Sequence, residues 1–226
     1  MGAYDRKEAT VNETDSKLRI IQVGRELLNA KDYHETVIDE IATRAGVAKG
    51  TVFFHFKSKE NLFREILFSV VDDIVTMMRR VNEMHAGGLQ KLRQVYDEYI
   101  DLCVKNQHLI ISIQRELARG SSSDSGEVTA LHREILNRFA PAGEVLREIA
   151  AQMKTDGVLK EYGAGGEALI SPMVMTFAGA VGSMVHLYRS SPDFARLRDL
   201  LWGILMHGIL RENVSQTILE TERTQL

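Results

Sequence analysis

The sequence has little cysteine, proline or net charge. Its one cysteine, Cys103, cannot form an intrachain disulfide, which excludes a disulfide-stapled secreted domain. Seventeen glycines and three prolines among 226 residues are too few for a collagen-like or low-complexity scaffold. The 28 basic and 31 acidic residues give a net charge of −3, so any binding to nucleic acid requires a local basic patch. These features favour a globular protein of the reducing cytoplasm.

Long apolar runs are scarce as well. Residues 1–16 are polar and of mixed charge, so we expect a flexible arm over residues 1–14 and no signal peptide. Residues 168–188 carry no Asp, Glu, Lys or Arg and are long enough to span a membrane. However, a helix buried on all sides in a protein core or a dimer interface has the same composition. We interpret this segment as such a helix and expect no membrane partner.

Helical periodicity dominates the sequence and predicts an all-α fold. Asp15 or Ser16 could cap a first helix whose apolar stripe is Leu18, Ile21, Leu27 and Leu28, and Thr36 with Asp39 resembles a capping box. Pro141 predicts a kink or break in an otherwise helical segment. The polar residues 120–126 predict a loop. The expected helices cover residues 15–31, 36–45, 49–54, 59–84, 89–105, 107–119, 127–155, 171–189 and 192–214.

The most informative stretch is residues 41–52, whose spacing suits a helix-turn-helix. Ala42 is small where two helices cross, Gly46 suits the turn, and Val52 can pack the second helix on the first. Between residues 44 and 59 there are four basic side chains and no acidic one, a concentration that can neutralise phosphates; they are Arg44, Lys49, Lys57 and Lys59. The alternative is an ordinary helical corner with a solvated basic edge.

A wider set of residues resembles the DNA-binding domain of the tetracycline-repressor (TetR) family of bacterial regulators. The set covers residues 18–63 and includes Tyr33, Thr36, Ile41-Ala42, Ala45-Gly46-Val47, Gly50-Thr51, His55-Phe56, Ser58-Lys59-Glu60 and Leu62-Phe63. The resemblance implies a helix-turn-helix DNA-binding domain at residues 15–62. It further implies a helical ligand-binding and dimerisation domain at residues 63–226. The function implied is that of a DNA-binding regulator, a repressor released from its operator by a small, largely apolar effector.

The resemblance also assigns roles to individual residues. The third helix would enter the major groove, so Lys49, Gly50 and Thr51 are the expected base readers. His55, Lys59 and the start of the second helix around Thr36 would bind phosphate. Phe53, at the same surface, replaces a tyrosine that is usual in the family. Ala48 replaces a common serine and Asp32 a common glycine. Phe53 and Ala48 favour the alternative of a helical ligand-binding or architectural protein with degenerate, non-specific DNA binding.

The rest of the chain supports only broader expectations. Histidines lack metal-ligand spacing, and neither a nucleophile elbow nor a phosphate-binding glycine loop is present, so we expect no metal, cofactor or enzyme activity. The candidate ligand residues, which could equally be plain core, are Met77, Tyr96, Tyr99, Gln114, Arg115 and Phe139. A homodimer interface is expected on the last two long helices, although both could instead pack within one subunit. Its candidate residues are Phe177, Gly179, Val181, Gly182, Met184, Leu201, Trp202 and Leu205.

Overall fold

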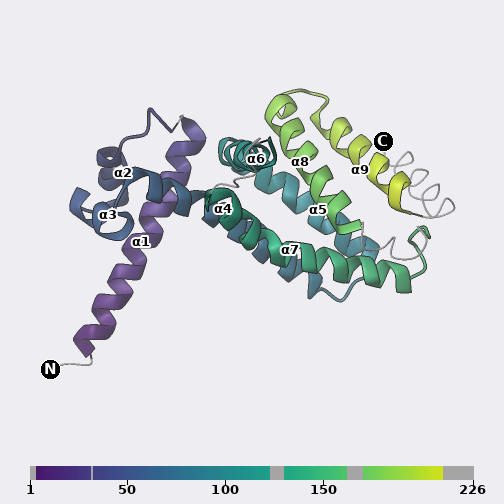
Figure 1. The fold of residues 1–226 in the computed structure, drawn as a ribbon, viewed down its shortest axis with the longest axis horizontal. Coiled ribbons are helices and arrows are strands. Elements are labelled where there is room, and N and C mark those ends of the chain that lie inside the picture. The colour runs from purple at the N-terminus through teal and green to yellow at the C-terminus, as the bar shows by residue number, and fades with distance from the viewer. Residues whose placement is uncertain (1–3, 32, 123–129, 162–169, 211–226) are drawn as a thin grey trace. The chain divides into compact units, whose positions relative to one another are not determined.

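The structure, a computed structural model, describes residues 4–31, 33–122, 130–161 and 170–210. Within these ranges the regular secondary structure consists of helices (Figure 1), apart from an isolated antiparallel bridge between Leu159 and Leu210. The helices are α1 (Tyr4–Ala30), α2 (Ile38–Ala45), α3 (Lys49–Phe56), α4 (Lys59–Asn82), α5 (Gly88–Lys105), α6 (Gln107–Ser122), α7 (Ala130–Thr155), α8 (Ile170–Tyr188) and α9 (Phe194–Ile209). The all-α prediction is therefore confirmed.

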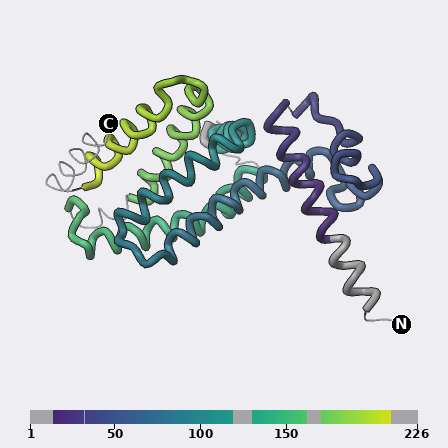
Figure 2. Tube along the Cα trace, turned by 180° about the vertical axis from the view of Figure 1, so that it is seen from behind, coloured from purple at the N-terminus to yellow at the C-terminus, as the bar shows by residue number. Residues whose placement is uncertain are grey.

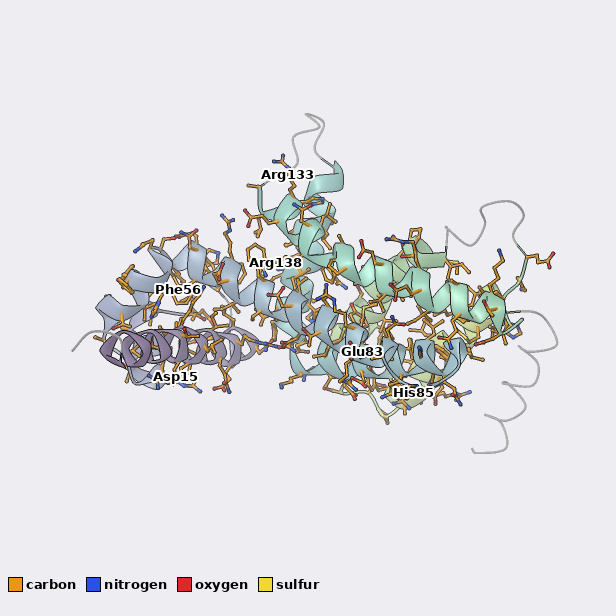
Figure 3. The ribbon with its side chains drawn as sticks, turned by 90° about the horizontal axis from the view of Figure 1, so that it is seen from below. Asp15, Phe56, Glu83, His85, Arg133 and Arg138 are labelled. Atoms are coloured by element: carbon orange, nitrogen blue, oxygen red, sulfur yellow. The ribbon has the colours of Figure 1, made fainter. Side chains whose placement is uncertain are left out.

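Two compact units divide the chain differently from the expected domains. The first unit comprises residues 1–71 and 108–135, and the second comprises residues 72–107 and 136–226. Helices α4 and α7 each contribute residues to both units. Within the first unit, Arg64 of α4 pairs with Glu134 of α7 at 2.5 Å. Within the second, Nη1 of Arg138 contacts both carboxylate oxygens of Asp72 at 2.6 and 2.9 Å (Figure 3 labels Arg138).

In the first unit, α1 packs on α2 and α3 (Figure 2). Its buried apolar positions are Ile20, Leu27 and Leu28, and Gly24 lies so close to Ile66 of α4 that a Cβ would collide with it. The predicted stripe was wrong at Leu18, which is exposed, and at Ile21, which is only half-buried. The stripe is shifted because Gly24, with no side chain, sets where α1 meets α4.

The predicted starts of the first two helices were also wrong. Helix α1 begins at Tyr4, so residues 4–14 are helical rather than a separate arm, and Asp15 lies inside the helix, paired with Arg19 at 2.7 Å (Figure 3 labels Asp15). The N-cap of α2 is Val37, with no side-chain cap bond, and Thr36 is buried. Thr36 is thus part of the interior rather than a cap, whereas Asp15 is exposed on a helix that begins eleven residues earlier.

The second unit is organised around α5, which contacts α8, and α8 in turn contacts α9 (Figure 1). The turn between α4 and α5 is held by α7: Asp156, just beyond its end, accepts a hydrogen bond from the Gly88 amide at 2.8 Å, and Gln152 donates one to the Ala86 carbonyl at 2.9 Å. Helix α7 runs through Pro141 without a break, and α6 extends to Ser122. Of the predicted kink or break at Pro141, the break was wrong, and the kink stays a prediction. The loop predicted at residues 120–122 was wrong, because these residues end α6; residues 123–126 lie outside the described ranges.

The sequence predicts that residues 168–188 form a helix buried on all sides, in a core or a dimer interface. Within a single chain, helix α8 is buried on one side only. Among the described residues it is the one helix long and apolar enough, by length and composition alone, to cross a membrane, and a third of that stretch is buried. Val181, Gly182, Met184 and Val185 face the interior of the second unit. Met173, Leu187 and Tyr188 are exposed. One side of the helix therefore forms part of the core, and the other side is exposed to solvent in a single chain.

Candidate nucleic-acid interface

The corner between α2 and α3 has the geometry of a helix-turn-helix. Gly46 follows α2 with φ 66°, in the left-handed region that glycine adopts at little cost. Its amide donates to Thr43 at 3.2 Å, and the Val47 amide donates to Ala42 at 3.0 Å, closing the end of α2. Ala42 and Val52 are both buried at the contact between the two helices. The predicted roles of these three positions are confirmed.

Helix α3 has one buried and one exposed face. Val52 and Phe56 point into the first unit, and Figure 3 labels Phe56 on the side of α3 toward α1. The exposed face carries Lys49, Gly50, Phe53 and Phe54. A Cβ added to Gly50 would meet no atom within 4 Å. Nothing within the chain therefore requires glycine there, although glycine in a helix is less stable than alanine by about 1 kcal/mol.

The two ends of α3 are conformationally unusual. Its N-cap, Ala48, makes no side-chain cap bond, as expected where alanine replaces serine. At its C-terminal end, Lys57 has φ 66°, a left-handed conformation that costs a non-glycine residue roughly 1 kcal/mol or more. The Lys57 amide still closes the helix by donating to the Phe53 carbonyl at 2.9 Å. The strained residue thus lies next to the exposed aromatic side chains of α3.

Each of the four basic residues has a defined neighbour. Lys49 pairs with Asp39 of α2 at 2.8 Å, and Arg44 pairs with Glu26 of α1 at 3.3 Å. The Lys57 ammonium donates to the Phe54 carbonyl at 2.8 Å. The Lys59 ammonium lies 4.3 Å from the centroid of the Tyr33 ring. Carboxylates from outside residues 44–59 thus partly neutralise the cluster, which counting charges along the segment did not reveal.

The residues expected to contact phosphate occupy different environments. His55 is half-buried, and its Nε2 lies 2.8 Å from the Ser16 hydroxyl of α1. Thr36 is 1% exposed, so its side chain does not face solvent. The predicted phosphate contact at the start of α2 around Thr36 stays a prediction, and the buried side chain leaves it to the backbone N–H groups of that turn. Lys59, Thr51 and Phe53 remain at least partly accessible. Asp32, the third departure from the family pattern, lies outside the described residues.

Tyr33, in the turn between α1 and α2, contacts the start of α4. Its ring packs against Phe63 with centroids 4.8 Å apart, and its hydroxyl donates to Glu60 at 3.3 Å. Partial burial, with the Glu60 charge as a smaller cause, raises the pKa of Tyr33. Hydrogen bonds from the Glu60 backbone and the Ser58 hydroxyl lower the pKa of Glu60. The cluster fixes the Tyr33 ring beneath the Lys59 ammonium.

The predicted ligand residues do not fall within one unit. Gln114 and Arg115 belong to the first unit, whereas Met77, Tyr96, Tyr99 and Phe139 belong to the second. The Tyr96 hydroxyl donates to the Arg198 carbonyl at 2.6 Å and the Tyr99 hydroxyl to the Ala178 carbonyl at 3.2 Å. Tyr96 and Met77 are buried. Both tyrosines thus tie α5 to the last two helices.

The predicted dimer residues separate into two groups. Five are buried inside the second unit of a single chain, so their place in a dimer interface stays a prediction: Val181, Gly182, Met184, Trp202 and Leu205. Trp202 packs against Tyr96 with ring centroids 5.2 Å apart, and the Arg93 guanidinium lies 5.0 Å from its ring. Phe177, Gly179 and Leu201 are half-buried, so they border solvent. The exposed large apolar side chains of these helices lie at other positions: Met173, Leu187, Tyr188, Leu200 and Ile204.

Sequence reasoning missed three residues that shape this surface. Asp39 was interpreted as a helix cap, and Glu26 and Ser16 were not connected with the basic segment. The one signal available was that Asp39 and Thr43 are four residues apart, which places both on the exposed side of α2 when Ile38, Ile41 and Ala45 face inward. Which basic residue Asp39 would meet depends on the angle between α2 and α3.

The comparisons with known proteins agree with this geometry. Residues 20–66 match the family described as bacterial regulatory proteins, tetR family. The fatty acid metabolism regulator protein of Bacillus subtilis (strain 168) is 25% identical over 120 residues, 53% of this chain and 62% of that protein. The HTH-type transcriptional activator FasR of Mycolicibacterium smegmatis is 31% identical over 83 residues, 37% of this chain and 38% of that protein. The chain thus aligns with less than two thirds of the length of each.

A solved structure extends the likeness of fold beyond the first helices. The transcriptional regulator FadR from Bacillus subtilis, in complex with stearoyl-CoA, superposes with a TM-score of 0.66 at 22% identity. The superposition covers 85% of this chain and 98% of that one. Residues 20–66 thus match the tetR family of bacterial regulatory proteins, and the superposition shows that the fold of such a regulator extends over most of the chain.

Proposed function

We propose that the protein is a sequence-specific DNA-binding transcriptional regulator of the bacterial cytoplasm. The observation that carries this proposal is the exposed face of α3, where Lys49 and Gly50 stand in the first turn of a helix held by the Gly46 corner. Lysine can donate to guanine O6 and N7 in the major groove, and a residue without a side chain permits close approach of a base edge or phosphate. Phe53 and Phe54 provide apolar contact for thymine methyl groups.

Selection from a library of randomised DNA duplexes tests the proposal directly. The chain should enrich a two-fold symmetric sequence. Lys49→Ala should weaken binding to that sequence by roughly 1–3 kcal/mol and relax the preference at one base position. Lys59→Ala should instead weaken all duplexes alike and lower the salt slope by about one. Failure to enrich any sequence would support the alternative of an architectural, non-specific DNA-binding protein, which Phe53 and the uncapped Ala48 favour.

We further propose that two chains form a homodimer through the outer sides of α8 and α9. On α8 the exposed positions 173, 176, 180, 183 and 187 follow a spacing of three and four residues, which places them in one stripe. On α9, Leu200, Ile204 and Gly208 are exposed at intervals of four. A single recognition helix reads few base pairs, so useful specificity needs two half-sites about 34–36 Å apart, or a multiple of that distance.

The third part of the proposal is release from DNA by a small, largely apolar effector in the second unit. The apolar residues Met77, Tyr96, Tyr99 and Phe139 support it, because largely apolar linings with a few polar groups are typical of ligand sites. Since the superposable FadR was solved with stearoyl-CoA, that thioester is a suitable probe, with free coenzyme A as its control. An effector must bind the DNA-incompetent arrangement more tightly than the DNA-bound one, or it shifts nothing.

Thermal unfolding combined with DNA binding tests the effector. Stearoyl-CoA at 100 times its Kd should stabilise the protein by about 2.7 kcal/mol and should weaken binding to the selected duplex. Free coenzyme A should do neither to the same extent. Stabilisation without any change in DNA affinity would show that the second unit binds the thioester but does not use it as a switch.

A further inference from the structure

Asp39 and Lys49 form an ion pair across the helix-turn-helix corner. The Lys49 ammonium lies 2.8 Å from Oδ1 and 3.1 Å from Oδ2 of Asp39, so one ammonium contacts both carboxylate oxygens. Asp39 stands in the first turn of α2 and Lys49 is the first residue of α3. The side chains are 66% and 56% exposed, respectively. The pair therefore lies on the solvent side of the corner, at the end of α3 that carries the proposed base readers.

The corner does not need this pair to fold. Exposed ion pairs contribute little to stability because water and salt screen them and because two flexible side chains must be ordered. The contact between α2 and α3 is already made by the buried side chains of Ile41, Ala42 and Val52, and the Gly46 turn is closed by backbone hydrogen bonds. A different consequence follows from the position of the carboxylate: it neutralises and orients the ammonium of Lys49.

We propose that Asp39 is a specificity-determining residue that acts through Lys49; this inference rests on the proposed function. Lysine has three N–H donors, and at most two can be directed at the Asp39 oxygens. The remaining donor is held in a restricted orientation at the surface of α3, where a guanine acceptor can meet it. The pair biases the long side chain toward this orientation before DNA binds, so part of its ordering cost is removed for a matching base.

The same pair weakens the contribution of Lys49 to non-specific binding. A phosphate attracts a free ammonium whatever the base sequence, and this attraction provides most of non-specific affinity. While Lys49 is paired, its charge is offset by the carboxylate, and contact with a phosphate would require it to leave Asp39. The pair thus favours matching sequences over random DNA in two ways, through a positioned donor and through a masked charge.

Asp39→Asn tests the inference because it removes the charge and keeps the shape. Binding is measured, as a function of salt, to the duplex that the wild-type chain selects and to a scrambled duplex of the same base composition. For the scrambled duplex we expect affinity to rise and the salt slope to steepen by about one, since Lys49 becomes free to engage one phosphate. For the selected duplex we expect no such change. The ratio of the two affinities should fall about twofold to fivefold, the range set by an exposed ion pair.

Two controls separate this role from a general charge effect. Asp72→Asn makes the same change of atoms in an ion-paired aspartate outside the helix-turn-helix, and it should leave the ratio unchanged. In a Lys49→Ala background, Asp39→Asn should no longer alter the ratio or the salt slope. Asp39→Glu, which retains the carboxylate, should preserve most of the discrimination.

The possible outcomes distinguish failure of this inference from failure of the proposed function. An unchanged ratio in Asp39→Asn, or an equal change with and without Lys49, overturns the inference while sequence-specific binding stands. If the wild-type chain selects no sequence, the proposed function fails and the inference fails with it. Urea unfolding of each variant accompanies the binding assays, and a midpoint close to the wild-type value shows that the corner is folded.

Discussion

At the scale of single residues, two glycines in the helix-turn-helix have opposite reasons for being glycine. Gly46 has φ 66°, which a side chain disfavours, whereas Gly50 has an ordinary helical backbone and open space around it. The chain's own packing explains Gly46. For Gly50, the explanation that follows from the proposed function is close approach of DNA to α3.

Substitution of these glycines should therefore separate folding from binding. Gly50→Ala should raise the free energy of unfolding by about 0.5–1 kcal/mol through helix propensity, and should weaken DNA binding because the new Cβ occupies the approach. Gly46→Ala, the matched control, should lower the free energy of unfolding by about 1 kcal/mol or more. Urea unfolding and binding to the selected duplex measure both effects. Undiminished affinity in Gly50→Ala would mean that DNA does not come close to the α3 backbone at this position.

Cys103 gives a second prediction at the scale of one residue. Burial raises the pKa of its thiol from 9.0 to about 12. Below about pH 8 the thiol is almost fully protonated in both folded and unfolded chains and contributes little pH dependence. Between about pH 9 and 12 the unfolded thiol ionises while the folded one stays protonated, so stability should fall as pH rises.

Because Cys103 is the one cysteine of the chain, reaction with a thiol reagent reports on the burial of this residue alone. At pH 8 the folded protein should react with a disulfide reagent much more slowly than the protein in concentrated urea, because the thiolate is the reactive form and the residue is buried. Stoichiometric reaction of the folded protein within seconds would contradict the burial of Cys103.

At the scale of elements, the closest approach of α5 and α7 depends on Gly88. A Cβ there would lie 2.7 Å from the backbone nitrogen of Met153 and 3.0 Å from the Ile149 carbonyl oxygen. Because backbone atoms cannot move aside as a side chain can, Gly88→Ala should destabilise the protein by roughly 1–3 kcal/mol. Its neighbour Gly87 has ordinary room, 3.5 Å to Asp156, so Gly87→Ala should cost less than about 1 kcal/mol. Equal urea midpoints for the two variants would show that α5 shifts freely against α7.

The elements also show what the sequence could and could not predict. Periodicity and the Gly46 signal were sufficient to predict α2, α3 and the corner between them, because these depend on residues within one short stretch. The start of α1 was not predictable, since Ser16 faces His55 of α3 rather than capping a helix. The pairing of Lys49 with Asp39 was likewise inaccessible, because it depends on the crossing of two helices. Residues within one stretch are thus sufficient to predict a helix, whereas the contacts that the helix makes with distant residues depend on the tertiary fold.

At the scale of the whole molecule, the exposed stripe on α8 and α9 bears on whether the protein is a monomer or a homodimer. Leu187 is 69% exposed and Ile204 55% exposed, and small residues at positions 179, 180 and 183 would let a second helix approach closely. A Cβ at Gly179 meets no atom of the described residues within 4 Å, so a side chain there starts in open space in a single chain. Such a surface is typical of an interface that a partner covers.

Charged substitutions in this stripe should therefore produce folded monomers. Leu187→Glu and Gly179→Arg each place a charge at the proposed contact, so light scattering should report half the wild-type mass while circular dichroism retains the helical spectrum. Leu18→Glu is the matched control, because Leu18 is also an exposed leucine, 61% accessible, on α1; it should remain dimeric. The monomeric variants should lose most affinity for a duplex with two half-sites, since each half-site then binds independently. If both variants remain dimeric and bind this duplex at wild-type strength, the subunits associate through another surface.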